Sequence, residues 1–352
     1  MNRATATMLG VGLLSVACGQ AQDLGSTESN AYPVTPGVLC TGQTDITDFK
    51  VDDRYVYCLS YGCVLAVDKR ASTAFPDVER TTHCTGGTAV GVAGDGSRVY
   101  VTGVAGPSPY DRGYIYTSPI SETQTSLVPM FASTTDDDGL AAFHYAADIV
   151  VDESRVYWTT ERGVYAGPKI APADAADFEL LADVEVLDPN VPPIRIGLVQ
   201  DAKNLYWARN TDVMMVPKTG GEAVPLAVGP SQITSLSIRS GWVYFAAGTV
   251  RRVSLSTREI QGFSVGPGWF NGVAADEHYV YASGSYANAN ASCSREQVTG
   301  YVVRVPLGGG EAEVVAEDQP CPSQVAVDES AVYWRTENPG ERAEVHRIPK
   351  SP

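Results

Sequence analysis

The sequence predicts an all-β protein, a seven-bladed β-propeller of four-stranded antiparallel blades. A short motif recurs seven times: an Asp, then five residues later a Tyr preceded by an aliphatic residue, as in Asp328 to Tyr333. Successive tyrosines are 37 to 57 residues apart, a period typical of propeller blades or helical arrays. Runs of Val, Ile, Tyr and Trp broken by Gly, Pro and Asp favour strands. The other copies end at Tyr57, Tyr100, Tyr157, Tyr206, Tyr244 and Tyr281.

The motif itself predicts the first two strands of each blade. A carboxylate at the start of a turn can accept a backbone N–H two residues on, which closes a hairpin. Arg239 stands in place of the Asp in the fifth copy. The aliphatic residue and the Tyr alternate along the second strand, so both faces of the sheet are expected to be buried between neighbouring blades. We therefore expect the seven tyrosines to be core residues.

A Val- or Ile-rich third strand follows each Tyr. Proline, which has no N–H for the ladder, marks the end of that strand in five copies. Glycine pairs such as Gly220–Gly221 then provide the turn into a fourth strand. Four antiparallel strands make one propeller blade. The five prolines are Pro119, Pro168, Pro217, Pro306 and Pro349.

The seventh copy has no sequence for a fourth strand, because only three residues follow Pro349. The segment from Ala31 to Leu39 precedes the first copy and has no partner of its own. We expect this segment to form the outer strand of the last blade and to close the ring, which removes an open sheet edge. The predicted propeller domain spans residues 31–350.

The first 17 residues are typical of a secretory signal peptide, with Arg3, an apolar stretch from Met8 to Leu14 and small residues before Cys18. The end of this segment resembles the lipobox of bacterial lipoproteins, although Ser15 stands where that family usually has Leu. The resemblance implies that Cys18 is lipidated, that residues 18–30 form a flexible tether, and that Gly19 directs the protein to the outer membrane. Cleavage by an ordinary signal peptidase is the alternative.

Charge limits the class of partner. The chain has 41 acidic and 25 basic residues, a formal net charge of −16. Nucleic acid is excluded as a partner, because binding phosphates requires a basic footprint. The acidity indicates a soluble, self-repelling surface, and we expect a monomer that touches the membrane through its lipid only.

Six cysteines remain after Cys18, and an even number behind an export signal predicts three disulfides. We expect all six on one face of the propeller. None lies in a C-x-x-C pair, so thiolate metal binding is not predicted. The alternative pairing of Cys58 with Cys63 and of Cys40 with Cys84 stays open. The favoured pairs are Cys293–Cys321, Cys63–Cys84 and Cys40–Cys58.

The segment from Val151 to Thr160, VDESRVYWTT, resembles the YWTD repeat of low-density-lipoprotein-receptor-type propellers. It is also similar to the repeat of secreted propeller lipoproteins from myxobacteria and related Gram-negative bacteria. The chain departs from the receptor pattern, because it has seven copies and none contains the full Tyr-Trp-Thr-Asp. The resemblance implies a propeller fold and an extracytoplasmic location, and it does not carry over the receptor ligands.

Long insertions concentrate on the face where the loops between strands two and three, and those between blades, emerge. These insertions are residues 103–113, 133–145, 283–300 and 335–344. Insertions accumulate on binding faces, although undirected loop drift would give the same lengths. The candidate binding residues, with mixed aromatic and polar chemistry, are Tyr110, Asp111, Arg112, Asp136, Asp138, His144, Tyr286, Asn288 and Asn290.

Evidence for catalysis is sparse in the sequence. The acidic run from Asp136 to Asp138 could offer oxygen ligands to Ca²⁺, but its spacing is not that of a calcium loop, and we expect no metal. Nucleophile-elbow, zinc-protease and phosphate-loop motifs are absent. We do not expect His83, His144, His278 and His346 to converge, and His144 beside the acidic run is the one catalytic candidate.

These features favour a non-catalytic extracytoplasmic propeller lipoprotein. Its loop face would bind a protein or a glycan at the cell envelope, with no cofactor. One alternative is a propeller enzyme of the lyase or lactonase type that uses a divalent cation. Another is a structural component of the envelope.

Overall fold

The structure is a computed structural model that describes residues 37–41, 46–60, 62–70, 80–84, 88–105, 112–120, 125–132, 146–170, 177–183, 197–286, 299–337 and 343–350. The chain divides into the units Met1–Asn30 and Ala31–Pro352, and all described residues belong to the second. The predicted signal peptide, Cys18 and the tether therefore lie outside the described residues. In the described part of the chain, no helix has the length and apolar composition of a membrane span.

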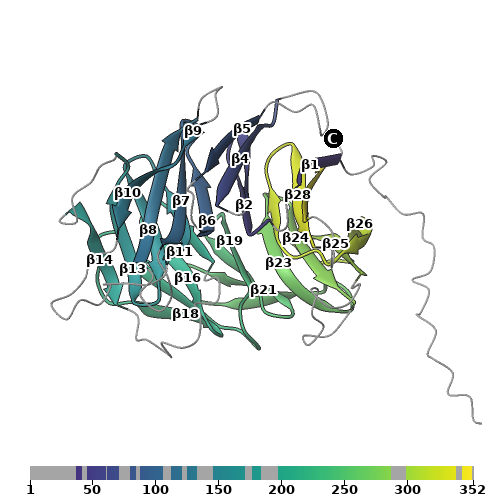
Figure 1. Cartoon of the computed structure of the whole chain (residues 1–352). Helices are drawn as coiled ribbons and strands as arrows, with labels where there is room; N and C mark the ends of the chain where they lie inside the picture. Colours follow the sequence, from purple (N-terminus) through teal and green to yellow (C-terminus); the bar gives the residue numbers. More distant parts are fainter. Residues whose placement is uncertain are drawn as a thin grey trace, which may run out of the picture. The chain divides into compact units, whose positions relative to one another are not determined.

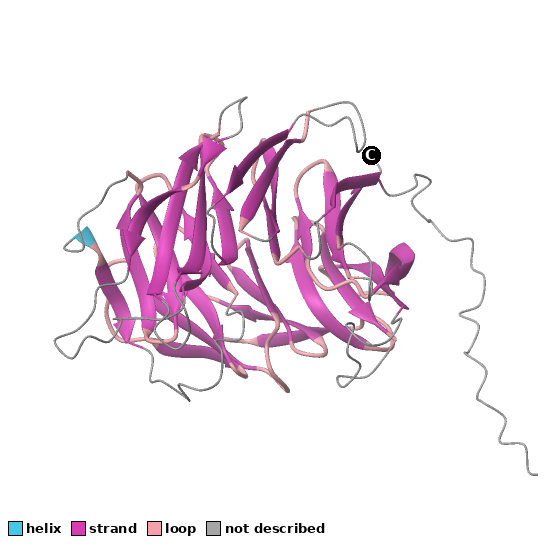
Figure 2. Ribbon diagram, viewed as in Figure 1, coloured by secondary structure: helices cyan, strands magenta, loops and turns pink. Residues whose placement is uncertain are grey.

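Seven sheets make up the second unit, and Figures 1 and 2 show that strands account for almost all of its regular structure. Blades one to three comprise, in chain order, β2 (Asp48–Val51), β3 (Tyr55–Ser60), β4 (Cys63–Asp68) and β5 (Arg80–Cys84); β6 (Thr88–Gly94), β7 (Arg98–Ala105), β8 (Arg112–Pro119) and β10 (Val128–Ala132); and β11 (Ala146–Val151), β12 (Arg155–Thr160), β13 (Gly163–Pro168) and β14 (Glu179–Asp183).

The same four-stranded order is found in the remaining blades, so the predicted seven-bladed propeller is confirmed. Blades four to seven comprise β15 (Leu198–Gln200), β16 (Asn204–Arg209), β17 (Asp212–Pro217) and β18 (Val224–Val228); β19 (Ser235–Arg239), β20 (Trp242–Ala246), β21 (Val250–Ser254) and β22 (Ile260–Phe263); β23 (Trp269–Ala275), β24 (Tyr279–Ser285), β25 (Thr299–Pro306) and β26 (Glu313–Pro320); and β27 (Val325–Val327), β28 (Ala331–Thr336), β29 (Glu344–Pro349) and β1 (Gly37–Thr41).

Strand β1 closes the ring as the sequence predicts. It pairs antiparallel with β29, with Gly37 opposite Arg347 and Thr41 opposite Glu344, and it forms the outer edge of blade seven. The paired strand starts at Gly37 and ends two residues beyond the predicted segment. Because residues from both ends of the domain share one sheet, blades seven and one are held in a single closed ring.

Blade one carries one strand more than the repeat predicts. The two-residue strand β9 (Thr125–Ser126), which precedes the outer strand of blade two, pairs parallel with β5 through His83–Thr125 and Cys84–Ser126. The Leu127 N–H donates to the Cys84 carbonyl at 2.9 Å. The extra strand covers the outer edge of blade one.

The first turn of a blade is built on both oxygens of its Asp. In blade three, Asp152 Oδ1 accepts the N–H groups of Ser154 and Arg155 at 2.9 Å each, and Oδ2 accepts the hydroxyl of Tyr157 at 3.0 Å. The predicted turn bond is therefore confirmed, and the hydroxyl bond explains the fixed spacing of five residues. The same arrangement occurs in Asp52–Tyr57, Asp95–Tyr100, Asp201–Tyr206, Asp276–Tyr281 and Asp328–Tyr333.

Blade five, which lacks the Asp, closes its first turn differently. Arg239 pairs directly with Trp242, and the two intervening residues, Ser240 and Gly241, have φ values of 48° and 78°. Two positive φ angles in a two-residue loop define a hairpin turn whose twist matches that of the flanking strands. Backbone geometry thus replaces the carboxylate in this blade.

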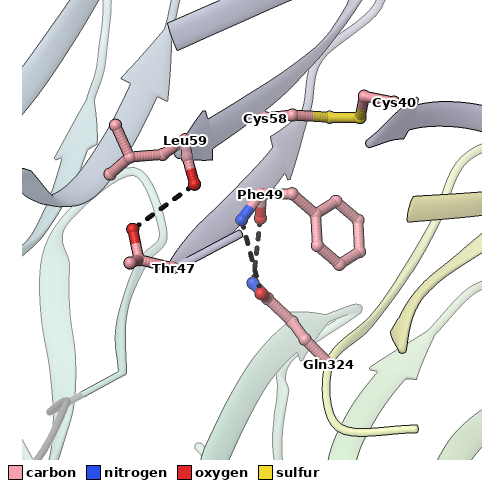
Figure 3. The surroundings of a disulfide bond; sticks show 6 residues. All are labelled: Cys40, Thr47, Phe49, Cys58, Leu59 and Gln324. Carbon is pink, nitrogen blue, oxygen red and sulfur yellow. Dashed lines mark hydrogen bonds between the residues drawn. A yellow bond between two sulfur atoms is a disulfide. The ribbon is translucent and has the colours of Figure 1, made fainter. Parts of the chain in front are cut away.

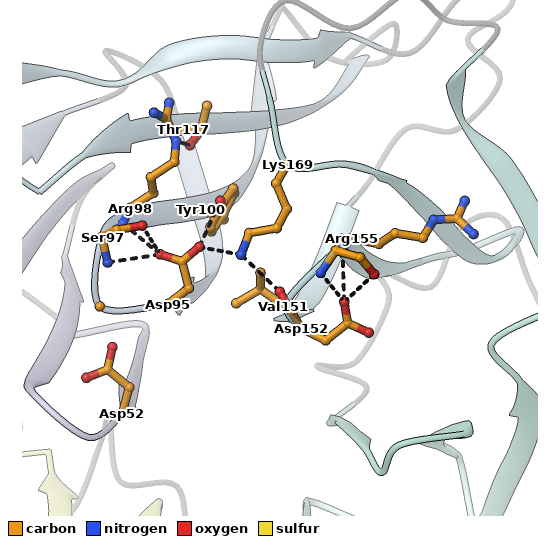
Figure 4. A network of polar contacts seen from close by, with 12 residues as sticks. Asp52, Asp95, Ser97, Arg98, Tyr100, Thr117, Val151, Asp152, Arg155 and Lys169 are labelled. Atoms are coloured by element: carbon orange, nitrogen blue, oxygen red, sulfur yellow. Dashed lines mark hydrogen bonds and ion pairs between the residues drawn. The ribbon is translucent and has the colours of Figure 1, made fainter.

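Lysines then connect neighbouring blades through the same carboxylates. Lys218 follows the third strand of blade four, and its Nζ lies 2.8 Å from Asp152 Oδ2 in blade three. Figure 4 shows the equivalent Lys169, which donates both to Asp95 Oδ2 at 2.7 Å and to the Asp152 carbonyl at 3.0 Å. The other two pairs of this kind are Lys69–Asp328 at 2.6 Å and Lys350–Asp276 at 2.7 Å.

The hydrophobic core lies between the blades. The motif tyrosines and the aliphatic residues before them are all buried, as predicted. One buried cluster joins Tyr281 and Val302 of blade six to Val332 and Trp334 of blade seven. Another joins Leu39 of β1 to Phe49 of blade one across the closing seam. Burial on both faces of each sheet therefore fixes the packing of neighbouring blades.

We predict that Asp152→Asn lowers the free energy of unfolding by about 1–3 kcal/mol, because it leaves the partly buried Tyr157 hydroxyl and Lys218 ammonium beside a neutral amide. Chemical denaturation measures the change. Glu277→Gln is the matched control: Glu277 pairs with Arg239 at 3.2 Å but is 69% exposed, so the loss should stay below about 1 kcal/mol. Equal losses in the two variants would contradict this account of the turn.

The same turns predict acid sensitivity. Burial alone would raise the pKa of Asp152, but Lys218 and the turn N–H groups hold this pKa well below its usual range. Burial would also raise the pKa of Asp328, but Lys69 and the bonds from Ser330 lower this pKa to about 2. A lowered pKa adds stability that is complete above about pH 4 and is lost as the pH falls toward the folded-state pKa. Asp152→Asn should therefore show a shallower loss of unfolding free energy between about pH 4 and pH 2 than the unaltered chain.

Candidate functional site

A cavity of about 610 Å³ lies where the first strands of all seven blades meet. Its wall is made by β2, β6, β11, β15, β19, β23 and β27, together with Arg335 of β28. The propeller topology predicts such a channel, because each blade turns its first strand toward the axis.

A ring of polar residues and glycines surrounds this channel. Each member stands four residues before the turn Asp of its blade, or before Arg239 in blade five. The polar side chains belong to blades one, three, five and seven, and each accepts an N–H from the first strand of the next blade. Figure 3 shows Gln324 of blade seven bonded to the backbone of Phe49 in blade one. The other bonds run from Val92 N–H to Asp48 Oδ2 at 3.1 Å, from Leu198 N–H to Asp148 Oδ2 at 2.8 Å and from Val273 N–H to Ser235 Oγ at 3.2 Å.

Glycine occupies the same ring position in the even-numbered blades, as Gly91, Gly197 and Gly272. At Gly91 an added Cβ would lie 2.4 Å from the carbonyl oxygen of Ala147 in the next blade. At Gly272 it would lie 2.6 Å from the carbonyl oxygen of Ser323. The close approach of neighbouring inner strands therefore requires glycine at these two positions.

One ion pair inside the channel joins blades one and three, which are not neighbours. Lys50 of blade one lies 3.2 Å from Asp148 Oδ1 of blade three. Burial raises the pKa of Asp148, Lys50 opposes this rise, and the nearby Asp48 carboxylate adds to it. Asp48 in turn accepts an N–H from Gln324 Nε2 at 2.9 Å. These channel carboxylates are thus bonded to groups of the propeller itself.

The described histidines belong to three different blades. His83 of β5 is buried with Nδ1 3.2 Å from Ser118 Oγ, and burial lowers its pKa. His346 of β29 stacks on Trp334 with ring centroids 5.5 Å apart, and burial lowers its pKa to about 4. His278 lies in the first turn of blade six. Within the described ranges, no three His, Cys, Asp or Glu side chains are grouped to hold a metal ion.

Two of the nine candidate binding residues fall in the described part of the chain. Tyr286 follows β24 and is 58% exposed. Arg112 begins β8, and its backbone pairs with Ala105 of β7. The other seven lie outside the described residues, so their place on the binding face stays a prediction: Tyr110, Asp111, Asp136, Asp138, His144, Asn288 and Asn290.

Disulfides secure the first blade and the closing seam. Cys40 of β1 is bonded to Cys58 of β3, which links blade seven to blade one (Figure 3). Cys63 and Cys84 are bonded where β4 begins and β5 ends. Both bonds are those that the sequence analysis placed first, and they exclude its alternative pairing. Cys321 is also disulfide-bonded, while Cys293, its predicted partner, lies outside the described residues.

Sequence reasoning missed the lysines that join the blades and the polar ring around the channel. The recurring Pro-Lys dipeptides at Pro168, Pro217 and Pro349 were a usable signal for the lysines. The spacing gives no comparable signal for the polar ring, because the residue at that position varies among Asp, Ser, Gln and Gly from blade to blade.

Comparison with known proteins identifies the fold. No protein-family model and no curated protein matches this chain. The WD40 beta propeller domain of Doa1 is similar in structure, with a TM-score of 0.59 and 10% identity over 88% of this chain and 96% of that one. The computationally designed Ika8 protein has a TM-score of 0.53 and 12% identity over 88% and 98% of the two chains. At these identities the similarity shows the β-propeller fold alone.

Proposed function

We propose that this protein is an exported, non-catalytic propeller whose loop face binds a protein or a glycan at the cell envelope. The observation that carries this proposal is the contrast between the two ends of the propeller. The turn end holds the first turn of each blade, and the loop end, which is the loop face, holds the connections between strands two and three and between blades. At the turn end, short turns direct their carboxylates to N–H groups, tyrosines and lysines of the fold. At the loop end, β7, β24 and β28 end within the segments that the sequence analysis predicts as long insertions, and the exposed Tyr286 follows β24.

The channel wall supports the same conclusion. The carboxylates of Asp48 and Asp148 hold neighbouring inner strands together. Groups that fasten the fold in this way have a structural role already, and their removal would loosen the ring. The loop face is where insertions and surface aromatic groups can vary without disturbing the scaffold, which is the usual place for recognition.

The disulfides favour an oxidising compartment for the mature chain. With the lipobox-like sequence before Cys18, they support export and lipid attachment at Cys18, with residues 18–30 as a tether to the outer membrane. We further propose that the YWTD-like repeats belong to a secreted bacterial propeller lipoprotein that acts as a monomer.

Site-specific photo-crosslinking in the producing cells tests the binding face. A photoreactive residue at Tyr110 or Asn288 should give a defined adduct with an envelope component, whereas one at the exposed turn residues Glu153 or Glu329 should not. A protein partner gives one discrete mass increase, and a glycan gives a heterogeneous one. Adducts formed equally from both ends, or from the turn end only, would contradict the proposal.

Intact-mass analysis of membrane-extracted protein tests the anchor. The mature chain should begin at Cys18 and carry the added mass of acyl groups. Cys18→Ala should remove the acyl mass without changing the disulfides, since the propeller cysteines are separate. A wild-type chain that starts at another residue, or that lacks acyl mass, would remove the lipid anchor from the account.

A further inference from the structure

The propeller repeatedly holds a cation between a tyrosine ring and a carboxylate. Lys218 Nζ lies 5.0 Å from the centroid of the Tyr157 ring and 2.8 Å from Asp152. An ammonium or guanidinium gains from the ring face and from the carboxylate together. Three further examples are Lys350 with Tyr281 and Asp276, Arg304 with Tyr279 and Glu313, and Arg54 with Tyr55 and Asp68.

Tyr286 presents a similar ring to solvent. It is the only aromatic residue among the large, exposed hydrophobic side chains of the described ranges. Its ring lies against Tyr301, with centroids 4.7 Å apart, and its N–H donates to the Thr299 carbonyl at 3.3 Å. Tyr301 is buried, donates its hydroxyl to the Pro267 carbonyl and meets Phe270 edge-on at 5.7 Å. A fixed second ring thus supports one side of Tyr286 and leaves the rest of it accessible.

Two exposed carboxylates accompany this ring. Gly300 is opposite Gln319 and Val302 is opposite Ala316, so β26 has one residue more than β25 between these pairs. Glu317 and Asp318 lie in that bulge, across from Tyr301, and both are exposed. Burial raises the pKa of Tyr286, and the two carboxylates add to the rise. Bulges commonly re-aim side chains at the rim of a sheet.

We propose that Tyr286, Glu317 and Asp318 form a cation-binding patch that receives a lysine or arginine side chain of a protein partner. The assignment rests on the proposed function and specifies the chemistry of the partner. Within the described ranges no lysine or arginine covers the Tyr286 ring, although the chain supplies one in the four internal examples. A basic protein segment suits two adjacent negative charges better than a neutral glycan does, and the net charge of −16 would steer it toward the surface.

Fluorescence anisotropy with a labelled tetralysine peptide, with tetraglutamine as the uncharged comparison, tests the patch on the full chain. Tyr286→Leu should weaken tetralysine binding about tenfold, since it removes the π face and keeps an apolar side chain. Tyr286→Phe should bind like the unaltered chain. Glu317→Gln with Asp318→Asn should weaken binding and flatten its salt dependence.

The double variant Glu153→Gln with Glu329→Gln is the matched control, because it removes two exposed carboxylates from the turn end. It should leave tetralysine affinity within about twofold of the unaltered value. An equal loss in the two double variants would show general attraction to an acidic surface and overturn the patch. Unchanged binding in Tyr286→Leu would overturn it as well.

A further outcome separates this inference from the proposed function. A neutral oligosaccharide whose binding needs Tyr286 but ignores Glu317→Gln with Asp318→Asn would overturn the cation assignment and leave a loop-face binding protein. Crosslinks from the turn end would instead overturn the proposed function, whatever the peptide does.

Discussion

The turn aspartate is the group on which the rest of the propeller depends. One oxygen of Asp152 fixes the first turn of its own blade, and the other receives the Tyr157 hydroxyl and the Lys218 ammonium of the next blade. A single carboxylate thereby joins local hairpin geometry, burial of the motif tyrosine and contact between blades. Blade five is the exception, because Arg239 replaces the Asp there and a hairpin with positive φ angles closes the turn. Asp52 and Asp201 keep the turn and the tyrosine bond, while Ile120 and Leu255 occupy the lysine position in the blades that follow them.

Much of the fold could be predicted from the sequence because its main determinants are local. The Asp-to-Tyr spacing, the alternation of Val156 with Tyr157 and the proline after the third strand each act within one blade. The closing strand β1 was also predictable, since a blade without a fourth strand and an N-terminal segment without a partner complement each other. These local signals agree with the global fold at each level.

The candidate site was less predictable, because it depends on contacts between blades. Lys50 and Asp148 are 98 residues apart and meet only because the closed ring brings the first strands of blades one and three to the same channel. Glu317 and Asp318 also look like ordinary surface acids until a bulge places them opposite Tyr301. Periodicity cannot reveal these relationships, since they follow from the closure of the ring and from one inserted residue.

The propeller has polar groups that bond within the fold and an aromatic group that is exposed to solvent. Carboxylates at the turns and along the channel bind partners within the fold, and a disulfide fastens the closing seam. A rigid ring of this kind can hold recognition groups at fixed positions, which lowers the entropy lost on binding. The exposed Tyr286, supported by buried aromatic rings, is consistent with that use.

Hydrogen–deuterium exchange after Asp276→Asn tests the central claim most directly, because Asp276 belongs to blade six and its lysine, Lys350, to blade seven. If one carboxylate couples two blades, amide exchange should accelerate in the first turn of blade six and along β29 of blade seven. The turns of blades two to four should keep their wild-type protection. Acceleration confined to the blade-six turn would contradict the coupling of neighbouring blades through the turn aspartate.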